Sequence, residues 1–76
     1  MEQQFDNILI FRSDIQTEAD THRIGMMLDN HPWIERWCVD LDDDERILRV
    51  VSAKLKHTNI VDIVAGCGYS CEELKD

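Results

Sequence analysis

Residues 36–51 read RWCVDLDDDERILRVV and show the pattern of a β-hairpin. Apolar side chains alternate with polar or small ones on both sides of an acidic stretch: Trp37, Val39 and Leu41 before it, Leu48 and Val50 after it. This two-residue period is typical of strands that bury one face. The acids at 42–45 supply the turn, so the stretch predicts two antiparallel strands joined by a short connection.

A strand and a helix precede the hairpin. The run Ile8–Phe11 is β-branched and aromatic and predicts a buried strand. Thr17 is followed three residues later by Asp20, an arrangement that caps free backbone N–H groups where a helix begins. The buried stripe of this helix is expected to consist of Ile24, Met27, Leu28 and His31. The helix should end before Pro32, because proline disfavours helical geometry in the residue that precedes it.

A second helix and a short strand follow the hairpin. After a link over residues 54–58, which contains His57, the apolar stripe of the helix is formed by Ile60, Ile63, Val64 and Cys67. Gly66 and Gly68 can end the helix, because glycine accepts positive φ, and residues 69–74 predict the last strand. The order β-α-β-β-α-β folds through short right-handed connections into an α+β, ferredoxin-like sandwich. Its four-stranded antiparallel sheet should carry both helices on one face.

The core is expected between the sheet and the two helices. The residues expected to be deeply buried there are Trp37, Val39, Leu48, Val50, Ile24, Leu28, Ile60 and Val64. If Leu9 and Phe11 also point inward, the uncovered face of the sheet carries an apolar stripe. That stripe, with Ile47 and Val51 more exposed than their neighbours, consists of Ile8, Ile10, Cys38, Ile47, Arg49 and Val51.

Composition restricts the function. A chain of 76 residues is too short to divide its core, so residues 1–76 are expected to form a single domain. Eight basic and sixteen acidic residues give a net charge of −8, which makes nucleic acid a poor partner. The sequence has no apolar run of the roughly 18 residues that span a membrane, and its start lacks the order of a secretory signal. We therefore expect a cytoplasmic protein with no membrane partner, whose three cysteines are reduced.

The chain resembles the heavy-metal-associated domain, the small copper-chaperone module that also repeats at the front of metal-pumping ATPases. The resemblance spans nearly the whole chain and is carried by Ile24 and Leu28 in the first helix, Pro32-Trp33-Ile34 where the family has Pro-Gly-Val, Val39-Asp40-Leu41, and Ile60, Val64, Cys67, Gly68 and Tyr69. It implies the same ferredoxin-like fold and no catalysis.

The departure from the family lies in its metal loop. The family reads Gly-Met-x-Cys-x-x-Cys before the first helix, whereas residues 14–20 here read DIQTEAD. The alignment places Thr17 and Asp20 at the two thiol positions and Ile15 at the buried methionine. Cu(I) prefers polarizable thiolates, and a hydroxyl with a carboxylate offers only hard oxygen atoms. We therefore expect a degenerate member that keeps the fold, lacks the metal site and carries no cofactor.

Other sites for a metal or a reaction have weaker support. Cys67 and Cys71 form an alternative thiol pair, although both occupy positions of small core residues and free cysteine behaves as a small hydrophobe. The acids at 40–45 resemble half of a calcium loop, but Glu45 and Val51 stand where such a loop needs glycine and glutamate. No catalytic triad or phosphate-binding loop can be assembled, so we expect no enzymatic activity.

The favoured hypothesis is a non-catalytic interaction module. It would bind a protein partner, or a second copy of itself, through the apolar stripe on the uncovered face of the sheet. The alternatives are a metal-handling protein that uses Cys67 and Cys71 or the acidic turn, and a small-ligand sensor of the kind that ferredoxin-like regulatory domains form by pairing their sheets.

Overall fold

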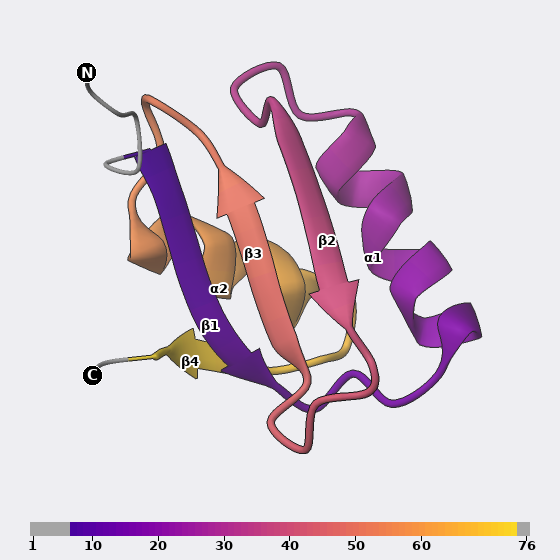
Figure 1. The fold of residues 1–76 in the computed structure, drawn as a ribbon. Helices are drawn as coiled ribbons and strands as arrows, with labels where there is room; N and C mark the ends of the chain where they lie inside the picture. Colours follow the sequence, from indigo (N-terminus) through magenta and orange to yellow (C-terminus); the bar gives the residue numbers. More distant parts are fainter. Residues whose placement is uncertain (1–6, 75–76) are drawn as a thin grey trace.

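The computed structural model describes residues 7–74 and contains the six elements in the predicted order. They are β1 (Ile8–Ser13), α1 (Glu18–Asp29), β2 (Arg36–Asp40), β3 (Ile47–Val51), α2 (His57–Gly66) and β4 (Cys71–Glu73). The strands form one antiparallel sheet in the order β2-β3-β1-β4. In Figure 1 the sheet is in front, α2 lies behind it and α1 runs beside β2. The ferredoxin-like fold is therefore confirmed.

The core lies where the sheet faces the helices. Leu9 is paired with Val50 and Phe11 with Leu48, so alternate residues of β1 and β3 point to the same side. The fully buried apolar residues are Phe11, Ile15, Ile24, Leu28, Leu48, Val50, Ile60 and Val64. Burying each of these side chains contributes roughly 1.5 to 3 kcal/mol. Because Leu9 and Phe11 are buried, the condition for an apolar stripe on the opposite face is met.

Two predicted core residues, Trp37 and Val39, are only half-buried. Both belong to β2, which is an edge strand with β3 on one side only. A side chain on an edge strand has a neighbouring strand on one side only. On the other side nothing but the helix layer can cover it. The prediction of deep burial is therefore wrong for these two residues, and it is right for Leu48 and Val50 in the adjacent strand β3.

The orientation of α1 also differs from the prediction. Met27 was expected in the buried stripe but is 54% exposed, whereas Gly25 is buried. A Cβ atom at position 25 would lie 2.7 Å from the ring of Trp37, so the absence of a side chain lets the helix approach β2 closely. The helix is consequently turned so that Ile24, Gly25 and Leu28 face the sheet.

The element boundaries differ from the predictions in several places. α1 ends at Asp29, so His31, which was expected in its buried stripe, lies beyond the helix and is half-buried. β1 continues to Ser13 because its last residues pair with β4. α2 begins at His57, inside the predicted link, and the imidazole packs edge-on against Phe11 with ring centroids 5.2 Å apart. Gly68 has φ +93° and ends the second helical segment as predicted, while β4 contains only Cys71–Glu73 of the predicted strand over 69–74. Neither helix within residues 7–74 has the length and apolar character needed to cross a membrane.

Candidate functional site

The loop before α1 is closed by hydrogen bonds that converge on Asp20. The Thr17 Oγ1 atom accepts from the Asp20 N–H at 3.1 Å, and Asp20 Oδ2 accepts from the backbone N–H groups of Gln16 and Thr17 at 3.2 Å each. The other carboxylate oxygen, Oδ1, accepts from the Tyr69 hydroxyl at 2.6 Å. The predicted capping arrangement is therefore confirmed, with a second interaction from the segment after α2.

The same contacts determine the ionisation of this pair. The Tyr69 hydroxyl, which donates to Asp20, lowers the pKa of that carboxyl below its usual value, and the backbone N–H groups act in the same direction. The carboxylate in turn raises the pKa of Tyr69, chiefly because the hydrogen bond requires the hydroxyl to keep its proton. Asp20 is thus an ionised acceptor whose two oxygen atoms already have donors.

The rest of the loop is held by the core and by the β2–β3 turn. Ile15, which the sequence resemblance aligns with the family's buried methionine, is fully buried. The Ser13 hydroxyl donates to the Arg46 carbonyl at 2.6 Å, and Arg46 Nη1 donates to the Gln16 carbonyl at 3.1 Å. The contact between Asp20 and Tyr69 was not foreseen. The only sequence signal for it was a tyrosine directly after the glycine that ends the second helix.

The alternative thiol site has unfavourable electrostatics. Cys67 and Cys71 are half-buried free thiols, and Cys38 is an exposed one. Burial, with a smaller contribution from the charge of Asp14, raises the pKa of Cys71 to about 11. Since the thiolate is the form that binds metal, a thiol that stays protonated at neutral pH is a poor ligand. Within residues 7–74 no three His, Cys, Asp or Glu side chains are grouped so that they could hold a metal ion.

Carboxylates of the acidic turn between β2 and β3 accept hydrogen bonds from backbone N–H groups of the same turn. Asp40 Oδ1 accepts from the Asp42 N–H at 3.1 Å, and Asp43 Oδ1 accepts from the Glu45 N–H at 2.8 Å, as is common in tight turns. Glu45 forms an ion pair with Arg12, with 2.7 Å between the nearest nitrogen and oxygen atoms. These contacts indicate that the acidic residues stabilise the turn between β2 and β3.

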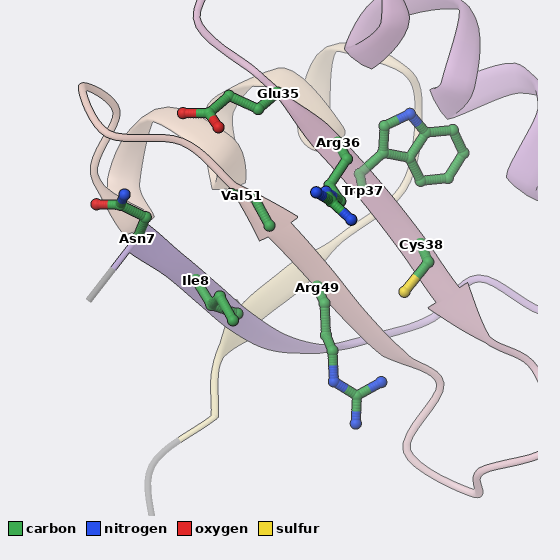
Figure 2. A pocket seen from close by; sticks show the side chains of 8 residues that line it. All are labelled: Asn7, Ile8, Glu35, Arg36, Trp37, Cys38, Arg49 and Val51. Atoms are coloured by element: carbon green, nitrogen blue, oxygen red, sulfur yellow. The ribbon is translucent and has the colours of Figure 1, made fainter. Parts of the chain in front are cut away.

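The uncovered face of the sheet, which we call the open face, carries side chains in rows across β2, β3 and β1. The strand register gives the rows Arg36–Val51–Ile8 and Cys38–Arg49–Ile10, and its continuation gives Asp40–Ile47–Arg12. The first two rows border a concavity of about 530 Å³, which we call the open-face concavity. The residues that line it are Asn7, Ile8, Glu35, Arg36, Trp37, Cys38, Arg49 and Val51 (Figure 2).

Two residues behave differently from their neighbours on this face. Ile47 was expected to be more exposed than Leu48 and Val50, and it is 4% exposed against 0% for both of them, so the order holds although the side chain is buried. Its neighbour in the row, Arg12, forms ion pairs with Glu45 and Glu72, and a long arginine side chain can cover an adjacent apolar residue. Trp37 contributes to the rim only, because its ring points toward α1 (Figure 2) and its Nε1 donates to Asp29. The described part of the open face thus offers no aromatic ring for base stacking.

Solved structures of copper-chaperone domains share this fold. The copper(I)-loaded first domain of the human copper chaperone for SOD1 has a TM-score of 0.75 and 14% identity, over 87% of this chain and 89% of that one. The yeast copper transporter domain Ccc2a has a TM-score of 0.76 and 21% identity, over 92% and 97%. A chain of the Atx1-Cu(I)-Ccc2a complex has a TM-score of 0.74 and 21% identity, over 91% and 96%.

These similarities establish the fold that the sequence resemblance implied. No protein-family model and no curated protein sequence matches the chain.

Proposed function

We propose that this protein is a non-catalytic interaction module, formed by residues 1–76 as a single domain, in which the loop of a copper-chaperone fold has become a structural cap. The observation that carries the proposal is the set of three hydrogen bonds that the Asp20 carboxylate already accepts. One oxygen accepts two backbone N–H groups and the other accepts the Tyr69 hydroxyl. A metal ion at this position would compete with these donors for the carboxylate oxygen atoms.

The chemistry of the loop supports the same conclusion. Thr17 and Asp20 provide oxygen atoms where the family provides two thiolates, and oxygen ligands suit hard cations rather than Cu(I). The hydroxyl of Thr17 is also engaged, since it accepts the Asp20 N–H. The half-buried Cys71, whose pKa is raised to about 11 by burial, is further from the thiolate form that binds metal than an ordinary thiol is.

The open face is the proposed binding surface. Its concavity combines half-buried apolar side chains with exposed charged ones, as protein interfaces do. One of the similar structures is a complex, Atx1-Cu(I)-Ccc2a, so a domain of this fold associates with another protein in that case. In the present chain we infer that association uses the sheet, because the loop before α1 serves the fold.

Copper titration tests the structural role of the loop. The reduced natural chain and the double variant Thr17→Cys with Asp20→Cys would each be titrated with Cu(I) and examined by native mass spectrometry. We expect one tightly held Cu(I) in the variant only, because its two thiolates lie one helical turn apart at the start of α1, where the helix lowers thiol pKa. Equally tight Cu(I) binding by the natural chain would refute the proposal and would direct attention to Cys67 and Cys71.

A further inference from the structure

The charges of the open-face concavity oppose those of the whole protein. The chain has a net charge of −8, yet the concavity is lined by two arginines, Arg36 and Arg49, and one acid, Glu35. A local excess of positive charge therefore lies in the concavity of an otherwise acidic protein. Charges beyond about 8 Å are largely screened at physiological ionic strength, so a contact in the concavity is decided by these near groups.

The two arginines are placed to act together. Arg36 lies in the row with Val51, and Arg49 lies in the next row on the neighbouring strand, opposite Cys38. Such diagonal positions are separated by roughly 7 to 8 Å, within reach of two long side chains that converge on one group. Both residues are exposed, and neither forms an ion pair with any residue in the range 7–74. Arg12, at the other end of the same face, is instead held by Glu45 and Glu72.

An apolar area adjoins the arginines. Val51 and Ile8 are neighbours in the row that begins with Arg36, and both are half-buried although no helix covers this face. Figure 2 shows that they and Arg49 rise from the same side of the sheet. A ligand that satisfies this surface must carry a carboxylate for a guanidinium and, about two extended residues away, an apolar group.

The position of the surface favours a protein segment as the ligand. The concavity lies on the outside of the sheet, whereas small molecules are held in sites that enclose most of their surface. A second copy is also less suited, because the concavity carries two arginines and only one acid, so a twofold contact would supply fewer carboxylates than guanidinium groups. An extended segment can cross β1, β3 and β2 and contact both kinds of group.

We propose that the open-face concavity binds an extended acidic segment of a partner protein, with a carboxylate on Arg36 and Arg49 and an apolar side chain on Val51 and Ile8. This proposal rests on the proposed function of the open face as a binding surface, and it specifies the chemical character of the partner. A guanidinium recognises a carboxylate through paired N–H donors, which makes the contact specific for acidic rather than merely polar side chains.

Selection from a phage-displayed library of random ten-residue peptides on the immobilised full chain tests this proposal. We expect the selected peptides to be enriched in Asp and Glu with an apolar residue two positions away. A synthetic copy of one selected peptide should bind about tenfold more weakly to the double variant Arg36→Gln with Arg49→Gln, since charge-assisted hydrogen bonds are lost. The matched control is Arg23→Gln, an exposed arginine on α1, which should not change the affinity.

A second variant separates this proposal from the proposed function. Ile8→Gln with Val51→Gln removes the apolar area without a change of charge. The selected peptides could lose binding to this variant, yet have no excess of acidic residues and bind the arginine variant normally. That result would refute an acidic partner but would keep the open face as an interface. Failure to select any peptide, or equal binding of the selected peptide to this variant and to the natural chain, would refute both the acidic partner and the open face as a binding surface. Concentration-dependent dimerisation that the same variant abolishes would assign the surface to a second copy.

The thiol of Cys38 provides an independent readout, because it is exposed on the open face opposite Arg49. A bound peptide should slow the reaction of Cys38 with a maleimide, measured by mass spectrometry of the digested protein. The half-buried Cys67 serves as an internal control whose rate should not change. Binding that leaves the rate at Cys38 unchanged would place the peptide elsewhere and contradict the proposal.

Discussion

Replacing Gly25 with alanine should destabilise the protein, although alanine is the better helix former. In a helix interior, alanine is favoured over glycine by about 1 kcal/mol. At this position, however, the added methyl group would lie 2.7 Å from Cζ2 and 3.1 Å from Cη2 of Trp37. The ring is restrained because its Nε1 donates to Asp29 Oδ1 at 2.7 Å. Overpacking of this kind costs about 1 to 3 kcal/mol, so the expected net effect is a loss of about 1 kcal/mol.

In the Trp37→Phe variant, the effect of Gly25→Ala on stability should have the opposite sign. Phenylalanine in place of Trp37 lacks the outer part of the indole that meets the methyl group, so Gly25→Ala in Trp37→Phe should gain about 1 kcal/mol from helix propensity. The two effects imply a coupling of about 2 kcal/mol in a double-mutant cycle. Urea denaturation of the four proteins, followed by far-UV circular dichroism, measures it. If alanine changes the free energy of unfolding equally in both backgrounds, the close approach of α1 to β2 is not what excludes a side chain at this position.

Three further predictions concern the core, the loop and the thiols. Leu28→Ala should lower the free energy of unfolding by about 2 to 5 kcal/mol in urea denaturation, because the side chain is fully buried; a smaller loss would contradict the packing of α1. Because the pKa of Asp20 is lowered in the folded state, its contribution to stability is present above pH 4 or so and is lost as the pH falls through the folded pKa. Tyr69→Phe should therefore weaken the loss of stability in acid, measured by urea denaturation at several pH values, and an unchanged acid profile would argue against the hydrogen bond. The pKa of Cys71, raised to about 11, predicts slower alkylation at neutral pH than at Cys38, and comparable rates by mass spectrometry would show that burial does not protect it.

The fold and the start of α1 could be predicted because their signals are local. The capping of α1 follows from two residues three positions apart, Thr17 and Asp20, and the structure has both reciprocal hydrogen bonds. The alternation in the hairpin identified Leu48 and Val50 as buried. Each of these inferences uses only a short window of sequence and the geometry of one element.

The remaining features depend on pairs of residues that the sequence does not place side by side. The exposure of Met27 follows from Gly25, whose missing side chain lets α1 turn toward the ring of Trp37. Ile47 is buried although it points to the uncovered face, and the continued register puts Arg12, a long side chain paired with Glu45 and Glu72, in the same row. Helical periodicity and strand alternation indicate which side chains share a face. They do not indicate which neighbour covers that face. The alternation therefore predicted that Ile47 points to the open face, but not that it is buried there.

The loop shows the same limit for function. The sequence identifies what Thr17 and Asp20 are not, namely thiol ligands, but not that Asp20 is joined to Tyr69 across the fold. A reading of the resemblance alone would describe the loop as the remainder of a lost site. The hydrogen bonds give it a role of its own, because the start of α1 and the segment after α2 are tied together there.

The strand order has a consequence for the time course of folding. β1 is a central strand, yet both of its partners, β3 and β4, lie later in the chain. During synthesis the β2–β3 hairpin can assemble as soon as it has emerged, whereas β1 can complete its hydrogen bonds only after Leu74 has been made, because the Leu74 N–H donates to the Ile10 carbonyl. Such non-local pairing slows folding, and it leaves the backbone of β1 as a bare edge until then. A polypeptide that stalls within α2 would therefore present one edge of an apolar strand for pairing with another chain.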